Sequence, residues 1–179
     1  MKLQSDLPLI DTLLKPYRQT LGDDFEAYRN HCCRVYNFCL ALSGNGAEKE
    51  EKIAITAVFH DLGIWTHKSF DYLEPSRRLA RSYLDRNGKS AWTNEVEAMI
   101  EEHHKITSYK SNNAWLVEAF RKADLVDISC GLVRFRLNKA FVREVLDKFP
   151  NAGFHKTLLK LTKVRFKSHP TNPLPMIKW

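Results

Sequence analysis

The chain has 179 residues, of which 44% are hydrophobic and 27% charged, and this composition indicates one soluble globular domain over residues 1–179. The longest apolar run, "IAITAVF", is far shorter than the roughly 20 residues of a membrane-spanning helix, and the first residues contain no export signal, so we expect a cytoplasmic protein without a membrane partner. The net charge of +7 favours a phosphate-bearing ligand, but Lys and Arg are spread along the chain and no specific nucleic-acid module is present.

Helical periodicity dominates the sequence. Apolar residues recur at three- and four-residue steps over residues 25–42, and the next helix is expected over 47–63, with acids in its first turn. Residues 63–73 are expected to form a loop. Further helices are predicted over 74–88, 93–106, 113–131, 138–150 and 154–167, followed by an extended arm rich in proline. Since no strand alternation accompanies them, the sequence predicts an all-α bundle of about seven or eight helices.

The four cysteines form no CxxC pair, which argues against a zinc ribbon or a thioredoxin-type site. We expect them to be reduced, half-buried and to pack as small hydrophobic side chains.

Four side chains of metal-ligand type stand in apolar sequence on three predicted helices. His31 lies beside the apolar stripe of one helix, His60 and Asp61 follow "TAVF" at the end of the next, and Asp124 is flanked by Ala, Leu and Val. Two imidazoles and two carboxylates suit a divalent ion such as Mn²⁺, Fe²⁺, Co²⁺, Ni²⁺ or Zn²⁺. Neighbouring helix residues project about 100° apart, so His60 and Asp61 reach one ion only at a helix end or kink, which Gly63 is expected to provide.

Each of these residues also has an ordinary explanation. A lone histidine on an apolar face is more often a hydrogen-bonded core residue, and Asp124 could pair with Arg121 or Lys122 nearby. The joint arrangement on three helices of one domain favours the metal site.

The pattern H…HD…D, formed by His31, His60–Asp61 and Asp124, resembles the HD-domain superfamily of metal-dependent phosphohydrolases. "FHDLGIW" is similar to the family's HD turn and "KADLVD" to its closing aspartate motif. The resemblance covers about residues 25–130 and leaves the last helices and the arm, 131–179, outside. More narrowly, "HDLGIWTHKSFDYLEPS", "EEHHKI" and "FPNAGFH" resemble a bacterial subgroup of small HD proteins. The resemblance implies an α-helical fold, a bound divalent metal and hydrolysis of phosphate esters or nucleotides.

His103 and His104 in "EEHHK" are the next candidates. HD proteins with two metals draw further ligands from such an element, so both are candidate second-metal ligands. Such centres usually use another histidine between the HD pair and this element. Here only His67 lies there, in a loop, which favours a single ion. The stretch could also be a plain charged helix end.

With one ion, which could be Mn, Fe, Co, Ni, Mg or Zn, we expect a metal-activated water to attack the phosphorus of the substrate. Asp61 takes part as a ligand, Lys105 is expected to stabilise phosphoryl charge, and His104 or His103 to protonate the leaving oxygen. Some HD nucleotidases place a glutamate shortly after the HD pair, where this chain has Ile64 and Trp65. Asp71 and Glu74, farther along the loop, could take the place of that glutamate or be a surface acid or helix cap. Further candidates for substrate binding are His67, Lys68, Arg77, Lys105 and Lys122, with Arg78 as a weaker one.

The loop aromatics Trp65, Phe70 and Tyr72 either stack on a ligand or pack beneath the loop. The remaining tryptophans, Trp92, Trp115 and Trp179, are expected to pack, as is the arm.

The sequence therefore predicts a metal-dependent phosphohydrolase acting on a small phosphorylated substrate, which could be a nucleotide. Two alternatives stay open. A diiron HD-fold oxygenase would need His103 or His104, and also His67, as ligands of a second iron. A non-catalytic, metal-stabilised domain would bind nucleotide or RNA through its positive surface.

Overall fold

The computed structural model describes residues 2–178, which contain no strand and one isolated bridge, between Lys105 and Lys178. Seven helices in this part of the chain have ten residues or more: α3 (Phe25–Ser43), α4 (Ala47–Phe59), α6 (Leu73–Arg86), α7 (Thr93–Glu102), α8 (Val117–Ile128), α9 (Lys139–Lys148) and α10 (Phe154–Ser168). The shorter α-helices are α1 (Pro8–Leu14), α2 (Arg18–Leu21) and α5 (Gly63–Thr66). The predicted all-α bundle is confirmed.

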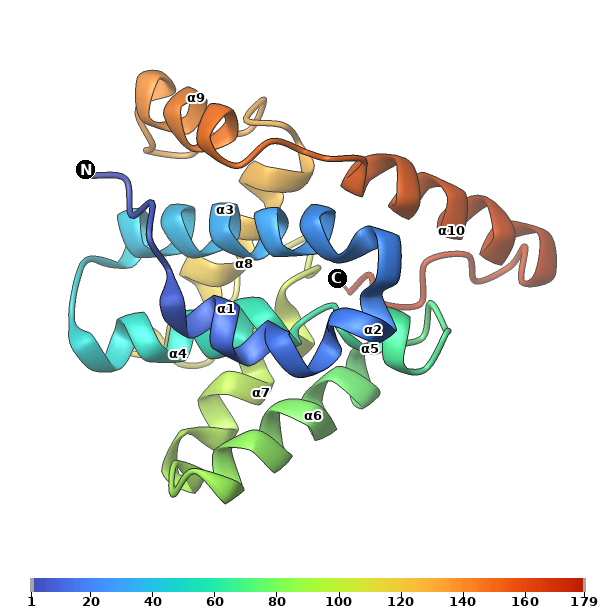
Figure 1. The fold of residues 1–179 in the computed structure, drawn as a ribbon, viewed down its shortest axis with the longest axis horizontal. Helices are drawn as coiled ribbons and strands as arrows, with labels where there is room; N and C mark the ends of the chain where they lie inside the picture. The colour runs from blue at the N-terminus through green and yellow to red at the C-terminus, as the bar shows by residue number, and fades with distance from the viewer. Residues whose placement is uncertain (1, 179) are drawn as a thin grey trace.

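Helix α3 runs through the middle of the bundle and packs against α4 and α8 (Figure 1). Nearly all of its residues are buried, the polar ones included, because neighbouring elements cover it on all sides. Its buried polar groups are therefore paired within the protein. Asn37, for example, accepts a hydrogen bond from the backbone N–H of Gln4 (2.8 Å) and donates one to the carbonyl of Gln4 (3.0 Å). A polar side chain on this helix needs a partner to be tolerated.

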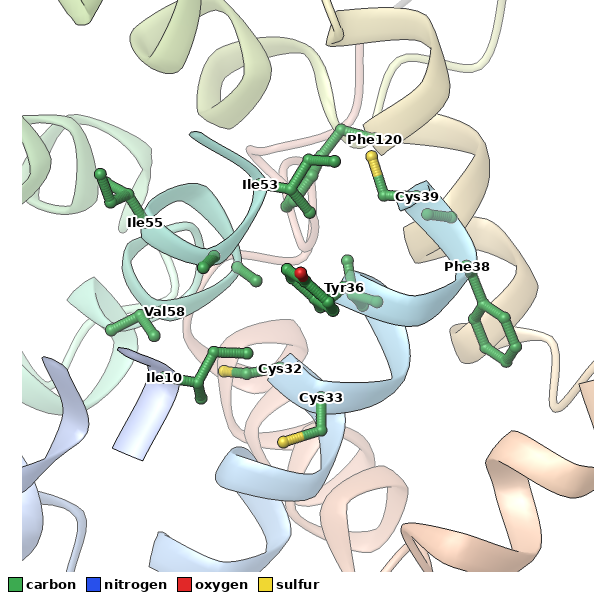
Figure 2. Packing of buried hydrophobic residues seen from close by; sticks show 14 of the residues in the cluster. Ile10, Cys32, Cys33, Tyr36, Phe38, Cys39, Ile53, Ile55, Val58 and Phe120 are labelled. Carbon is green, nitrogen blue, oxygen red and sulfur yellow. The ribbon is translucent and has the colours of Figure 1, made fainter. Parts of the chain in front are cut away.

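The apolar core fills the space between α1, α3, α4 and α8. Figure 2 shows Ile10, Cys32 and Val58 as members of one packed cluster contributed by three helices. Cys32, Cys33 and Cys39 are free thiols and are fully buried, deeper than the half-buried positions expected, whereas Cys130 is exposed. Burial raises the pKa of Cys33 to about 12, so its thiol stays protonated and packs as a small hydrophobic group.

The HD dipeptide lies in a turn between two helices. Helix α4 ends at Phe59, four residues before the predicted end, and residues 60–62 form a turn that leads into α5. The residue expected to end the helix, Gly63, instead begins α5. Its backbone N–H donates to Ser76 Oγ (3.0 Å), and a Cβ atom there would lie 2.5 Å from the carbonyl oxygen of Tyr72. Gly63 is therefore required by the close approach of α5 to the start of α6.

Other predicted helix bounds shift by a few residues. Helix α8 begins at Val117 rather than 113, and α7 ends at Glu102, so that residues 103 and 104 form a turn beyond it. Trp92 and Trp115 are partly buried against the core, as expected, and Trp179 lies outside the described residues.

The C-terminal arm returns from α10 along the bundle (Figure 1). Met176 is buried in a second apolar cluster with Ile64, Phe70, Tyr72 and Leu73. The backbone N–H of Ile106 donates to the carbonyl of Lys178 (2.8 Å), so the arm is fastened to the segment that follows α7. Within residues 2–178, no helix combines the length and apolarity needed to cross a membrane.

Candidate metal centre

Side chains from three elements meet beside the HD turn. His31 comes from α3, His60 and Asp61 from the turn after α4, and Asp124 from α8. The Nε2 atoms of His31 and His60 are 3.0 Å apart. They lie 3.7 Å and 3.5 Å from Asp61 Oδ2 and 3.7 Å and 3.8 Å from Asp124 Oδ1. All four residues are almost inaccessible to solvent, with no more than 2% exposed.

The hydrogen bonds of the two imidazoles determine which nitrogen faces this centre. His31 Nδ1 lies 2.7 Å from Asp127 Oδ2, and His60 Nδ1 lies 2.9 Å from the carbonyl oxygen of Ala57. A carboxylate and a carbonyl only accept hydrogen bonds, so both Nδ1 atoms carry the proton. In the neutral rings both Nε2 lone pairs therefore point toward each other and toward two carboxylates. This is the tautomer that Nε2 metal ligation requires.

One oxygen of each carboxylate at this centre has no hydrogen-bond donor. Asp61 Oδ1 and Asp124 Oδ1 are buried and accept no hydrogen bond. Leaving a buried carboxylate oxygen unpaired costs about 3 kcal/mol or more. A divalent cation removes this cost, and two imidazoles with two carboxylates form a donor set that suits a first-row metal. The residues present thus fit a divalent ion.

The electrostatics of the metal-free centre agree with this assignment. Burial by itself would lower the pKa of His60, but the carboxylates of Asp61 and Asp124 outweigh it and raise the pKa to about 9. Burial would raise the pKa of Asp61, but the surrounding histidines, His60 first, hold it well below its ordinary value. Without a metal, a proton on His60 supplies part of the positive charge that these carboxylates need.

The histidine pair after α7 contacts the same centre. His103 Nε2 lies 3.4 Å from Asp61 Oδ1, and His104 Nδ1 lies 3.6 Å from Asp124 Oδ2. Asp61, His103 and His104 each offer a ligand atom within 4.8 Å of the others, as do His31, His60 and Asp61. Asp61 is therefore shared by two groups of ligand-type atoms.

The buried Tyr72 lies behind this pair. Its hydroxyl oxygen is 2.8 Å from His104 Nε2 and 3.5 Å from His103 Nε2. Burial raises the pKa of Tyr72 well above its ordinary value, so the hydroxyl keeps its proton. His103 Nδ1 donates to the carbonyl of Ile100 (2.6 Å), which leaves its Nε2 without a proton in the neutral ring.

Three supporting residues were not anticipated from the sequence. Asp127 accepts from His31 and also from Arg34, through Nε and through Nη2 (2.9 Å), and all three residues are buried. Phe154, at the start of α10, stacks on the His31 ring with centroids 4.0 Å apart. Helical spacing does contain a signal for the first two: Asp127 follows Asp124 by three residues and Arg34 follows His31 by three, and such residues share a helix face.

Several predicted substrate-binding residues lie in other surroundings. His67 is exposed and its Nδ1 is 3.0 Å from Thr66 Oγ1, so the structure does not bring it into either ligand group. Lys68 lines a different cavity, between the loop and α10. Their position on the outer side of the loop separates both residues from the buried centre.

Two other candidates are held in ion pairs. Arg77 donates to Glu101 (2.9 Å) and Glu97 (3.3 Å), while Lys122 pairs with Glu118 (3.1 Å). The weaker candidates Arg78, Asp71 and Glu74 are exposed. Among the predicted cations, Lys105 is the one that shares a cavity with His103, His104 and Asp124.

Contacts also decide between the explanations offered for Asp124 and for the aromatic residues of the loop. Arg121, a predicted alternative partner of Asp124, donates instead to Glu118 (2.8 Å and 2.9 Å). Trp65 Nε1 donates to Asp24 (2.9 Å), and Phe70 and Tyr72 are buried, so the loop aromatics pack beneath the loop.

Comparison with known proteins agrees with this geometry. No curated protein and no solved structure matches the chain. The model of the HD domain family matches residues 28–130, which is more than half of the 179 residues and includes every member of the centre from His31 to Asp127. HD domains form a superfamily of metal-dependent phosphohydrolases. The chain belongs to the HD-domain family.

Proposed function

We propose that this protein is a metal-dependent phosphohydrolase that acts on a small phosphate ester. The observation that carries the proposal is the pair of buried carboxylate oxygens without partners, Asp61 Oδ1 and Asp124 Oδ1, beside two imidazoles whose Nε2 atoms carry no proton in the neutral ring. Few arrangements other than a cation site leave so many acceptors facing one another in a core.

His31, His60, Asp61 and Asp124 would hold the ion. When bound, a divalent ion lowers the pKa of a water molecule and polarises a phosphoryl oxygen. Behind these ligands, Asp127 and Arg34 fix the orientation of His31.

His104 is our candidate for donating a hydrogen bond, rather than the predicted proton, to the leaving oxygen. Burial lowers the pKa of His104 to about 4, so the ring is neutral near pH 7 and carries one proton. The Tyr72 hydroxyl lies 2.8 Å from His104 Nε2, and when it donates there the proton of the ring is on Nδ1, which lies 3.6 Å from Asp124 Oδ2. His104 and Asp124 line one cavity. Lys105, in the wall of this cavity, supplies a cation for the phosphoryl oxygens.

The alternative role of His103 and His104 is to bind a second metal ion. Asp61, His103 and His104 form a three-residue ligand group, and a shared carboxylate is a common feature of two-metal sites. A diiron oxygenase would need this group to hold iron. The number and identity of the metals in the purified protein separate the two functions.

The test begins with the metal content of the purified protein. The metal-free form is then reloaded with Mn²⁺, Fe²⁺, Co²⁺, Ni²⁺, Mg²⁺ or Zn²⁺ and assayed on a panel of phosphate esters and nucleotides. We expect metal-dependent release of phosphate. Asp61→Asn should abolish both metal binding and turnover, whereas Asp147→Asn, at an exposed position of α9, should retain both.

Three results would contradict the proposal. Wild-type protein that holds none of these ions refutes the metal site. Two irons per chain with O₂-dependent turnover identify an oxygenase. Tight nucleotide or RNA binding without turnover under any ion identifies a binding domain.

A further inference from the structure

A cavity of about 280 Å³ opens beside the metal centre. At one end it is lined by His103, His104 and Asp124. The rest of its wall consists largely of aliphatic side chains from three separate segments: Ile106, Leu125, Ile128 and Ile177. Ile106, Leu125 and Ile177 are among the large apolar residues that remain exposed, at 53%, 37% and 39%. The cavity is therefore lined by buried polar side chains and by apolar side chains that reach solvent, with Lys105 and Arg121 as its basic residues.

The basic residue Arg121 in this wall is engaged by the protein. It pairs with Glu118 and donates through Nη1 to the backbone carbonyl of Lys105 (3.0 Å). It thereby holds the backbone of the segment that follows His104. The part of the cavity away from the metal ligands offers mainly carbon atoms to a ligand.

The apolar wall is held in place from both sides. Ile177 belongs to the C-terminal arm, between the buried Met176 and Lys178. The carbonyl of Lys178 accepts from Ile106, and its Nζ forms ion pairs with Glu101 and with Glu102 (3.6 Å). The arm is thus anchored on the end of α7, directly before the turn that carries His103 and His104.

We propose that this cavity binds the organic part of the substrate and that this part is apolar: an alkyl or aryl group esterified to phosphate, rather than a sugar or a nucleoside. The inference rests on the proposed function, because it places the phosphoryl group at the metal centre. The adjoining wall then receives the leaving group. Hydroxyl or amide groups there would lose water without gaining partners, whereas a hydrocarbon chain gains by leaving water.

Binding is tested with ethyl-, butyl- and hexylphosphonate, which are not hydrolysed, by calorimetric titration of the metal-loaded protein. We expect the affinity to rise about two- to fourfold per added methylene until the cavity is filled, since burying a CH₂ group is worth a factor of about four at most. The kcat/KM values of the matching alkyl phosphates should rise in parallel and exceed those of glycerol phosphate and AMP.

Leu125→Asn and Ile177→Asn should each flatten this dependence on chain length. Both positions are partly exposed, so the changes leave the buried core intact. Leu132→Asn is the matched control, because Leu132 is 86% exposed and does not line the cavity. It should keep the wild-type slope. The affinities of the three phosphonates for the wild-type protein test the apolar site even where a variant fails to fold.

The outcomes separate this inference from the proposed function. Equal affinity across the phosphonates, or AMP and glycerol phosphate hydrolysed as well as hexyl phosphate, overturns the apolar site while the phosphohydrolase remains. Chain-length-dependent binding without hydrolysis of any ester supports the apolar site and removes the phosphohydrolase.

Discussion

Replacing Asp127 with asparagine should weaken metal binding although Asp127 is not itself a ligand. In the wild-type protein burial raises the pKa of Asp127, but His31 and Arg34 outweigh it and hold the pKa at about 2, so the side chain is an anion near neutral pH. It accepts from three N–H groups: His31 Nδ1 at 2.7 Å, Arg34 Nη2 at 2.9 Å and Arg34 Nε.

An asparagine cannot accept all three hydrogen bonds in either orientation. In one orientation its NH₂ group, a donor, faces the donor Arg34 Nε–H. In the other orientation the NH₂ group faces two donors, His31 Nδ1–H and Arg34 Nη2–H. To relieve the second clash, His31 must move its proton to Nε2, the atom needed for the metal. Loss of such a bond behind a ligand typically costs about 10- to 100-fold in metal affinity, or about 1.4–2.7 kcal/mol.

The assay is a titration of the metal-free protein with Zn²⁺ or Mn²⁺ in competition with a chelator, at about pH 7. Asp147→Asn, at an exposed position of α9, controls for loss of a carboxylate. Urea unfolding in EDTA measures how far Asp127→Asn destabilises the metal-free fold. A folded Asp127→Asn protein that binds metal within about twofold of wild type would refute the argument that Asp127 sets the tautomer of His31.

Three further predictions concern pH and packing. The pKa of His60 is about 9 in the metal-free protein, whereas metal ligation needs the neutral ring. Metal binding should therefore release about one proton per ion at pH 7, and fewer above pH 9. Calorimetric binding enthalpies that are identical in buffers of different ionisation enthalpy would contradict this. Gly63→Ala should destabilise the fold by about 1–3 kcal/mol in urea unfolding, because the new Cβ meets the Tyr72 carbonyl; an unchanged midpoint would show that the turn can adjust. Burial would raise the pKa of Glu118, but Arg121 and other hydrogen-bond donors lower it from 4.5 to about 2, so its stabilising contribution is complete above pH 4.5 and is lost as the pH falls toward 2. Stability measured from pH 6 to pH 3 should therefore fall less in Glu118→Gln than in wild type.

Much of the fold follows from local sequence patterns. Periodic apolar residues locate the long helices, and the glycine after α3 lies at the end of that helix as expected. The sequence predicts that His60 is still helical, because the first local stop signal in "AVFHDLG" is Gly63. The turn brings Gly63 against Tyr72 and Ser76 on the next helix, a tertiary contact that helical periodicity does not contain.

The site shows the same division between local and long-range information. Residue type and apolar context suffice to single out His31, His60, Asp61 and Asp124, since a buried ligand-type residue is conspicuous in a helix stripe. They do not separate Lys105, which lines the cavity beside His104, from cations such as Arg77, which does not line it. Which lysine or arginine lines the cavity depends on which helices pack beside it.

The segment beyond the HD match contributes directly to the centre. The match ends at residue 130, yet Phe154 stacks on His31 and Ile177 forms part of the cavity wall. The proposed metal ligands all lie within the match, in the part of the chain that defines the family. The shape and polarity of the space beside these ligands depend on α10 and the C-terminal arm. Selectivity for the organic part of a substrate should therefore follow changes in the arm, while metal binding should follow changes in α3, α8 and the HD turn.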